Sequence, residues 1–172
     1  AGVNAMSAID MALWDIKGKY ENKPVFELLG GKKQDYVVPY ASLQPIGHSF
    51  QEYKDSLVAW AIKAKELGFK AVKSEVTLNG PYAHSGLNEN DERTTEVVAA
   101  VRNALGPEIK LMIDVQYRWH DAEAALKTVK DWGEYDIYFL ETPVWTDDIN
   151  SYARMHDEAP MKIAAGEWLS TK

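Results

Sequence analysis

The sequence predicts an α/β protein, a parallel barrel of which this chain holds about the first five strand–helix units. Short apolar runs alternate with longer amphipathic segments, and three of the runs end in an acid, namely Asp114, Glu141 and Glu167. These acids lie 27 and 26 residues apart, and about 25 to 30 residues is the length of one strand with its helix. Each apolar run is therefore expected to be a buried parallel strand.

Two helices are expected before the first strand. Apolar residues between Ile9 and Ile16 recur at positions i, i+3, i+4 and i+7, which form one face of a packed helix. Pro24 then opens a short second helix that the pair Gly30 and Gly31 ends, because Pro suits the first turn of a helix and Gly the position after its last residue.

Beyond these helices, strands and helices alternate regularly. The expected strands are residues 37–43, 69–76, 110–114, 137–141 and 161–167, and the expected helices are residues 49–68, 91–105, 121–133 and 147–157. Ser49 and Glu52 have the spacing of a capping box for the first helix of this series. Residues 77–90 are polar and predict a long loop, and long loops in compact domains are often lids or binding loops. Such alternation is typical of a parallel α/β architecture.

The composition excludes several classes of function. The formal net charge is −7, whereas a nucleic-acid partner needs clustered Lys and Arg. The absence of Cys excludes disulfides, zinc–thiolate sites, iron–sulfur clusters and a Cys nucleophile for these residues. No stretch approaches the roughly 18 consecutive apolar residues of a membrane span and no secretory signal is visible, so we expect a cytoplasmic protein.

We expect the chain to be an internal piece of a longer protein. It lacks an initiator Met, begins within a helical pattern and holds five units of a barrel that needs about 250 residues. An open half-barrel leaves two unpaired sheet edges, so the isolated piece is expected to fold poorly and to be inactive.

The three strand-end acids form the most specific pattern in the sequence. The carboxyl ends of barrel strands meet at one mouth, where barrel enzymes place their chemistry. Three carboxylates there would repel one another unless a cation lay between them, and an all-oxygen ligand set suits Mg²⁺ first and Mn²⁺ second. Asp114, Glu141 and Glu167 are therefore the candidate metal ligands. The alternative is that each is a separate surface acid that caps the following helix.

Lys73 and Glu75 are the candidate catalytic residues. They lie two residues apart on the second strand and therefore point to the same face. Beside a metal the pKa of a Lys falls, so that it can remove a proton, and a Glu can act as acid or base. The alternative is a Lys–Glu pair that neutralises itself inside the barrel.

Gln116 and Arg118 are the candidate substrate contacts. Gln116 shares the inward face with Asp114 by strand alternation, and Arg118 lies on the loop that follows, where a guanidinium suits carboxylate recognition. The alternative is that Arg118 forms a surface ion pair and that Trp119 packs against its neighbours.

Several of these residues resemble a known family. The segments 7–19 and 24–31 are similar to the barrel entry of the mandelate racemase/muconate lactonizing branch of the enolase superfamily. Asp114, Glu141 within Leu-Glu-Thr-Pro and Glu167 within Ala-Gly-Glu-Trp resemble the three strand-end Mg²⁺ ligands of that branch. The resemblance extends over essentially the whole chain.

The resemblance implies a modified TIM-type (β/α)7β barrel with a separate capping domain. It assigns residues 1–36 to a helical entry segment that joins a capping domain outside this chain to the barrel, and residues 37–172 to the N-terminal part of the barrel. It also implies abstraction of the proton α to a carboxylate, with a Lys or His base and a Mg²⁺-stabilised enediolate. Racemase-like members carry Lys-x-Lys on the second strand, and Glu75 replaces the second Lys here, which argues against a two-base racemase.

We therefore predict a Mg²⁺-dependent dehydratase, a hydro-lyase whose small-molecule carboxylate substrate is a sugar acid. The loop segment 79–82 resembles the extended second-strand loops of acid-sugar dehydratases. The alternatives are a racemase or epimerase of a 2-hydroxy acid in the same superfamily, and a non-catalytic metal-binding barrel fragment. We expect neither nucleic acid nor a membrane as a partner, and a homo-oligomer in the full-length form.

Overall fold

The computed structural model describes residues 2–169, which fall into two units. One unit contains residues 2–38 and 168–169, and the other is Pro39–Glu167. The assignment of residues 1–36 and 37–172 to an entry segment and a barrel part stays a prediction. Residue 1 and residues 170–172 of that assignment lie outside the described residues.

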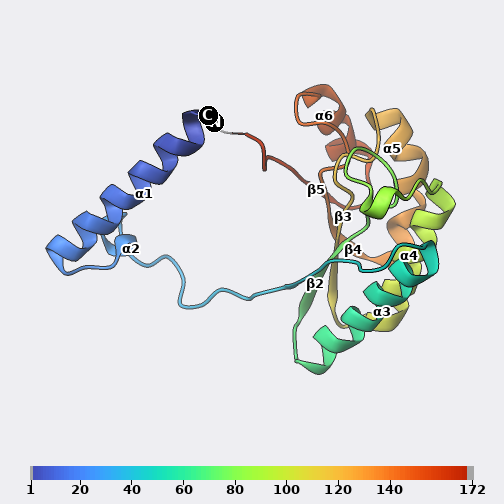
Figure 1. Cartoon of the computed structure of the whole chain (residues 1–172), viewed down its shortest axis with the longest axis horizontal. Coiled ribbons are helices and arrows are strands. Elements are labelled where there is room, and N and C mark those ends of the chain that lie inside the picture. The colour runs from blue at the N-terminus through green and yellow to red at the C-terminus, as the bar shows by residue number, and fades with distance from the viewer. Residues whose placement is uncertain (1, 170–172) are drawn as a thin grey trace. The chain divides into compact units, whose positions relative to one another are not determined.

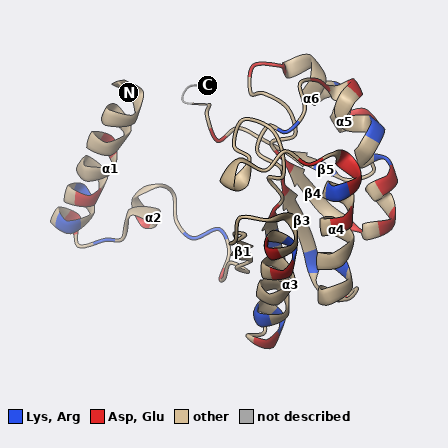
Figure 2. Ribbon diagram, turned by 45° about the vertical axis from the view of Figure 1, so that its right-hand side comes forward, with Lys and Arg blue, Asp and Glu red and all other residues tan. Residues whose placement is uncertain are grey.

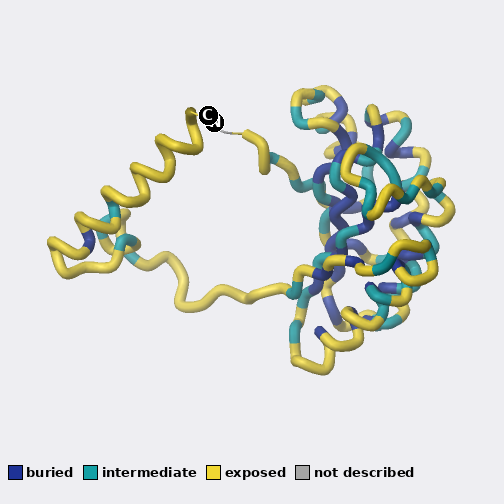
Figure 3. The backbone as a smooth tube through the Cα atoms, viewed as in Figure 1, coloured by how far each residue is buried: buried dark blue, intermediate teal, exposed yellow. Residues whose placement is uncertain are grey.

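The first unit consists of the helices α1 (Gly2–Glu21) and α2 (Val25–Leu28). The turn between them needs Gly18, because a Cβ atom there would lie 2.8 Å from the carbonyl oxygen of Lys23. The predicted helix is present, but its apolar face is exposed, with Ile16 61 % exposed (Figure 3). Within this unit two helices alone offer no second layer that could bury the face, so its expected packing stays a prediction.

The second unit is built on five parallel strands that pair in chain order. They are β1 (Ala41–Leu43), β2 (Ala71–Glu75), β3 (Lys110–Asp114), β4 (Ile137–Glu141) and β5 (Lys162–Ala164). Parallel strands that follow one another in chain order, each joined to the next by a helical connection, form the wall of a (β/α) barrel. The predicted fold class and the five strands are thus confirmed.

Four α-helices connect the strands, and all lie on one side of the sheet (Figure 1). They are α3 (Phe50–Glu66), α4 (Asp91–Leu105), α5 (Ala122–Val129) and α6 (Ile149–Glu158), and short 3-10 turns cover His84–Gly86 and Asp131–Tyr135. Charged residues of both signs are distributed along these helices (Figure 2). The predicted capping box of Ser49 and Glu52 is present at the start of α3. Among the described residues, no helix combines the length and the apolarity that a membrane crossing requires.

Three elements differ most from the predicted limits, and the others are within about two residues of them. β1 begins only at Ala41, because residues 37–40 are exposed and lie outside the sheet. α5 ends at Val129, and the chain continues as the 3-10 turn Asp131–Tyr135 instead of a longer helix. β5 ends at Ala164 instead of at residue 167, since Gly166 has a φ of 111°, outside the strand region.

The core of this unit lies between the sheet and the helices (Figure 3). Alternate strand residues are fully buried on the helix-covered side, in keeping with the period-2 alternation of a strand. They include Val72, Leu111, Ile113 and Leu140, which belong to one core cluster with Leu57, Val97 and Val101 of the helices. The polar residues of interest therefore alternate with this buried row along the same strands.

The register of the strands sets the acids side by side. Glu75 of β2 lies opposite Asp114 of β3, and Asp114 lies opposite Glu141 of β4. In a parallel sheet, residues in register at the carboxyl edge share one end of the barrel wall. The sheet itself thus brings three of the predicted site residues to one edge.

One irregularity interrupts this register in β4. Leu111 lies opposite Ile137, whereas the next residue, Met112, lies opposite Phe139. Tyr138 is therefore an extra residue in β4, and the strand is shifted by one residue from there to its carboxyl end. Such irregularities re-aim side chains and are often found next to active sites.

Tyr53 of α3 is tied to the carboxyl end of β2. Its side chain is fully buried, and its hydroxyl donates to the carbonyl oxygen of Glu75 at 2.9 Å and accepts from the N–H of Thr77 at 2.7 Å. Burial is the main reason why the pKa of this phenol is raised, so it remains protonated. The hydroxyl thereby satisfies two backbone groups at the point where β2 leaves the sheet.

We expect the substitution Tyr53→Phe to lower the free energy of unfolding by about 2 kcal/mol, because it leaves the buried N–H of Thr77 without its partner. Urea denaturation of the complete protein that carries this chain measures the effect. Tyr20→Phe is the control, since Tyr20 is 90 % exposed, and it should change stability by less than about 0.5 kcal/mol. Equal unfolding midpoints for both variants would show that the hydroxyl does not stabilise this junction.

Candidate active site

Lys73 places one positive charge between two of the strand-end acids. Its Nζ atom lies 2.7 Å from Oε2 of Glu141 and 3.4 Å from Oδ2 of Asp114. The side chains of Lys73, Glu141 and Asp114 are 15 %, 20 % and 11 % exposed. Two carboxylates at neighbouring strand ends repel each other unless a cation compensates them, and the ammonium group does so here. The structure thus brings Lys73, Asp114 and Glu141 together.

Two opposing effects act on the pKa of Lys73. Burial lowers it, while the hydrogen bond to Glu141 and the charges of Glu141 and Asp114 raise it, and the pKa lies above its ordinary value as a result. The ammonium is therefore charged at neutral pH in this arrangement. The alternative of a pair between Lys73 and Glu75 is not what the structure shows, because the ion pairs of Lys73 are made with the acids of β3 and β4.

The carboxylate of Asp114 has partners on both oxygens. Oδ1 accepts from the hydroxyl of Thr142 at 3.0 Å and from the N–H of Gln116 at 3.1 Å, while Oδ2 faces Lys73. Thr142 was not among the predicted site residues. The one signal in the sequence is its place directly after Glu141, where a hydroxyl could reach the acid of the neighbouring strand.

The helix-cap alternative is wrong for Asp114 and Glu141. The side chain of Asp121 caps α5, and the side chain of Asp148 caps α6. The acids at the ends of β3 and β4 are therefore not needed for the helices that follow them, which leaves their carboxylates available for another role.

Glu167 does not join these two acids. It lies three residues beyond the end of β5 and is exposed, and its Oε1 accepts from the hydroxyl of Tyr117 at 2.8 Å. Over residues 2–169 no group of three or more His, Cys, Asp or Glu is arranged to hold a metal. The expectation that three acids meet at one point therefore holds for two of them in this structure, and Gly166, at a positive φ, separates the third from the strand.

The two converging acids fit a hard divalent cation. Oδ2 of Asp114 and Oε2 of Glu141 already share a single positive charge, that of the Lys73 ammonium. Carboxylate oxygens are the ligands that Mg²⁺ and Mn²⁺ prefer. An ion bound to these oxygens would take over the role of Lys73 as their counter-charge.

Glu75 is the β2 neighbour of Asp114 in this register. Its Oε1 accepts from the hydroxyl of Thr77 at 3.3 Å. Burial, and to a smaller degree the charge of Asp114, raise the pKa of Glu75, while Thr77, His84 and Gln44 oppose the shift. The carboxyl is therefore protonated more readily than that of an ordinary Glu, which suits a group that donates a proton.

Arg118 forms a partly buried ion pair with Asp91 at the start of α4. Its Nε and Nη2 donate to Oδ1 of Asp91 at 2.9 and 2.6 Å, and Nη2 also donates to the carbonyl oxygen of Glu89 at 3.1 Å. The Arg118 side chain is only 3 % exposed. This pair fastens the loop after β3 to the helix before it.

Nε and Nη2 of Arg118 are held by the protein's own groups, whereas its buried Nη1 has no partner among the described residues, so the substrate contact of Arg118 stays a prediction. The ion pair of the alternative is present, but only Asp91 reaches the surface, since the Arg118 side chain is buried. The packing expected for Trp119 is confirmed, since this residue is 7 % exposed and its ring meets that of Trp132 edge to face. Gln116 is half-buried at a φ of 43°, and its substrate contact stays a prediction.

Aromatic rings from three successive loops lie beside one another. The ring of Tyr117 is 5.8 Å from that of Tyr82 and 4.8 Å from that of Trp145, measured between centroids. These residues follow β2, β3 and β4, and Tyr82 and Trp145 are exposed. Aromatic side chains commonly line small-molecule sites, so this row is a candidate wall beside the acids.

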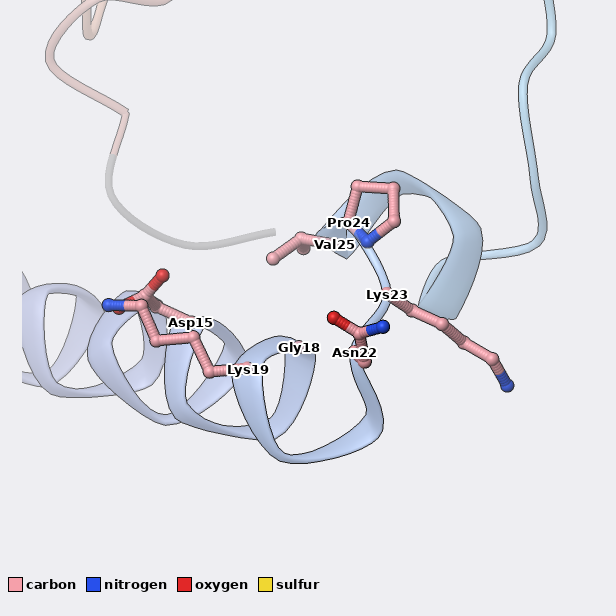
Figure 4. Close-up of a pocket in the computed structure, with 7 residues that line it drawn as sticks. All are labelled: Asp15, Gly18, Lys19, Asn22, Lys23, Pro24 and Val25. Atoms are coloured by element: carbon pink, nitrogen blue, oxygen red, sulfur yellow. The ribbon is translucent and has the colours of Figure 1, made fainter.

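A separate hollow of about 330 Å³ lies in the helical unit, between α1 and α2 (Figure 4). Its lining residues are Asp15, Gly18, Lys19, Asn22, Lys23, Pro24 and Val25. The charged pair Lys19 and Asp15 is largely exposed. None of the predicted site residues lines this hollow, so it is not a candidate for the catalytic site.

The pKa of Asp91 provides a test of its ion pair with Arg118, which fastens the loop after β3 to α4. Burial raises the pKa of Asp91, but hydrogen bonds from Thr128, Arg118 and Trp119 outweigh it and hold the pKa below its ordinary value. A lowered pKa means that the carboxylate stabilises the fold above the unfolded-state pKa of about 4 and that this contribution is lost as pH falls through the folded-state pKa.

We expect Asp91→Asn to lower the free energy of unfolding by about 2 kcal/mol at pH 7, because it leaves the buried guanidinium of Arg118 without its counter-charge. The value is below that of a fully buried pair, since the Asp91 side chain is 37 % exposed. The difference in free energy of unfolding between this variant and the wild type should become smaller below about pH 4. Urea denaturation across pH measures it, with Asp157→Asn on the exposed side of α6 as control. A gap that is independent of pH would contradict the assignment.

We expect Lys73→Met to destabilise the metal-free protein by about 3 kcal/mol, because two nearly buried carboxylates lose their counter-charge. Saturating Mg²⁺ should recover part of the loss, since it compensates the same oxygens. Chemical denaturation in EDTA and in Mg²⁺ tests both statements. The exposed Lys70, changed to Met, is the control. Indifference of the Lys73 variant to Mg²⁺ would speak against a cation between Asp114 and Glu141.

Two family models match the chain. Residues 56–172 match the model described as enolase C-terminal domain-like. Residues 2–30 match the N-terminal domain of the mandelate racemase/muconate lactonizing enzymes. The first match alone covers more than half of the chain.

Known proteins agree with this match. The D-gluconate dehydratase of Thermoproteus tenax is 38 % identical over 168 residues, which are 96 % of this chain and 32 % of that protein. The crystal structure of the 3,6-anhydro-D-galactonate cycloisomerase from Zobellia galactanivorans has a TM-score of 0.79 and 36 % identity, and covers 96 % of this chain and 42 % of its own. A dipeptide epimerase from Enterococcus faecalis V583, solved with Mg and a dipeptide, has a TM-score of 0.73 and 26 % identity over 92 % of this chain and 39 % of its own.

The chain therefore spans less than half the length of each of these relatives. Its strand order, its strand-end acids and its similarity over almost the whole chain lead to the same assignment, which confirms the predicted resemblance. The chain belongs to the enolase superfamily, in the branch of the mandelate racemases and muconate lactonizing enzymes.

Proposed function

We propose that this chain is part of a Mg²⁺-dependent dehydratase that acts on a sugar acid. The observation that carries the proposal is the pair of carboxylates, Asp114 and Glu141, which share one positive charge at neighbouring strand ends. The identity of 38 % to a D-gluconate dehydratase supports the reaction class. Glu75 in place of a second Lys on β2 supports a lyase over a two-base racemase.

Asp114 and Glu141 would hold the metal, and Glu167 is proposed as the third ligand on the family pattern. When bound, Mg²⁺ would act as a Lewis acid toward the carboxylate of the substrate, and Mn²⁺ could replace it. The dipeptide epimerase of similar fold, solved in complex with Mg, supports the choice of ion. For Glu167 to contribute, its side chain would have to leave the hydroxyl of Tyr117, which it contacts at 2.8 Å.

Lys73 is proposed to bind the substrate carboxylate or to take the α-proton. The ammonium is charged while Glu141 and Asp114 are its partners, and in that state it attracts a carboxylate. Without these partners, burial would remain as the main effect and would lower the pKa of Lys73 toward the range that a base needs. The same side chain is thus suited to either role, depending on what compensates the two acids.

Glu75 is proposed to give a proton to the leaving β-hydroxyl. Dehydration removes a proton from the α-carbon and a hydroxyl from the β-carbon, and the hydroxyl leaves as water only if it receives a proton. The raised pKa of Glu75 supports this role, because a protonated carboxyl is available at higher pH than for an ordinary Glu. Gln116 is proposed as a contact to the hydroxyl groups of the substrate.

An isomerase is the second candidate. The two solved structures described above are a cycloisomerase and an epimerase, and both are similar to this chain over more than nine-tenths of its length. A racemase or epimerase shares the abstraction of the α-proton and returns a proton to the other face. Proton NMR in D₂O separates the classes, since a 2-keto-3-deoxy product indicates dehydration and α-exchange without loss of water indicates epimerisation.

We expect Glu141→Gln to reduce Mg²⁺-dependent turnover of the active sugar acid by a factor of about 1,000 or more, because it removes a charged ligand of the metal. The complete protein is assayed on a panel of sugar acids, and circular dichroism checks that the fold is kept. Glu108→Gln, in the exposed turn before β3, is the control and should retain full activity.

Undiminished turnover in the Glu141 variant would refute the metal assignment. Metal binding by the wild type without turnover on any substrate of the panel would instead support the non-catalytic alternative and refute the dehydratase.

A further inference from the structure

We propose that Thr142 is a positioning residue that turns Asp114 so that only Oδ2 faces the cation. The inference rests on the proposed function, because it takes the carboxylates of Asp114 and Glu141 as the place of the cation. Two independent observations on Thr142 support it, namely the contact of its hydroxyl and the conformation of its backbone.

The hydroxyl of Thr142 fixes one oxygen of Asp114. It lies 3.0 Å from Oδ1, and both residues are buried, at 2 % and 8 % exposed. The N–H of Gln116 donates to the same oxygen at 3.1 Å. With two donors on Oδ1, rotation of the carboxylate would break two hydrogen bonds in a buried place, so Oδ2 remains the oxygen that faces Lys73.

The backbone of Thr142 has a conformation that does not suit a Thr. Its φ is 46°, and a positive φ in a β-branched residue is a genuine outlier that Gly would relieve. The strained conformation is held from two sides, because the Thr142 N–H donates to the carbonyl oxygen of Ala164 at 2.9 Å and its carbonyl oxygen accepts from the N–H of Tyr117 at 2.6 Å.

The hydroxyl contact gives a reason why a Thr occupies a position of unfavourable backbone conformation. Backbone geometry alone would favour Gly at this position, whereas the hydroxyl supplies a donor that Gly lacks. Strained residues that the surrounding structure holds in place are concentrated at functional sites. Groups that orient a metal ligand from behind tune metal affinity, and their loss typically costs about 10- to 100-fold.

The experiment compares Thr142→Val, which keeps the shape and loses the hydroxyl, with Thr142→Ser, which keeps the hydroxyl. Titration calorimetry of the complete protein with Mg²⁺, without substrate, gives the dissociation constants. We expect Val to weaken Mg²⁺ binding at least about tenfold and Ser to stay within about twofold of the wild type. Wild-type affinity in the Val variant, or equal weakening in both variants, would overturn the inference.

Thr142→Gly is the second variant, since it relieves the backbone and removes the hydroxyl. It should fold at least as readily as the Val variant and still bind Mg²⁺ about tenfold more weakly. Wild-type Mg²⁺ affinity in this variant would also overturn the inference. A crystal structure of the metal-free Val variant gives a readout without metal, in which Asp114 should be turned. An unchanged Asp114 would count against the inference.

These measurements also separate the inference from the proposed function. Weaker binding in the Val and Gly variants, together with no dehydration of any sugar acid, would support the role of Thr142 and refute the dehydratase. Dehydration that depends on Mg²⁺, together with unchanged affinity in both variants, would refute the role of Thr142 alone. A wild-type protein that binds no Mg²⁺ would overturn both.

Discussion

The arrangement of the barrel mouth depends on the compensation of two negative charges. Asp114 and Glu141 end neighbouring strands in register, and the sheet leaves them no freedom to separate. A positive charge must therefore lie between them, and the ammonium of Lys73, from β2 on the other side of β3, provides it. Fold and site are linked at this point, because the same parallel register that buries the core also forces the acids together.

A second ion pair, 27 residues apart in sequence, organises the surroundings of the mouth. Arg118 and Asp91 join the loop after β3 to α4, and Thr128 of α5 donates to the same carboxylate at 2.6 Å. This loop carries Gln116 and Tyr117 next to the acids. The position of residues beside the site is thus fixed by a contact with the start of α4, in which the Arg118 side chain is buried and the Asp91 side chain is partly exposed.

Local patterns predicted much of the fold, and distant contacts account for the rest. The strand ends at Asp114 and Glu141 follow from apolar runs, and the capping box of Ser49 follows from a four-residue motif. The partner of Arg118 could not be predicted, because guanidiniums suit protein and ligand carboxylates equally well. The contact of Thr142 with Asp114 depends on the positive φ of Thr142, and the Glu167 side chain lies away from the other two acids because the chain turns at Gly166. Hydrophobic periodicity reveals neither of these backbone conformations.

The extra residue in β4 has a consequence for how this strand can vary. Because Tyr138 shifts the register, Glu141 stands opposite Asp114; if the residues after Ile137 paired without this shift, that place would fall to Leu140, whose side chain belongs to the opposite face. An apolar group would then meet the acid, and the carboxylate would turn toward the helices. The shift in pairing, and not the residue type at position 138, therefore keeps this carboxylate at the mouth, and a regularly paired strand without Tyr138 would keep Glu141 opposite Asp114 as well.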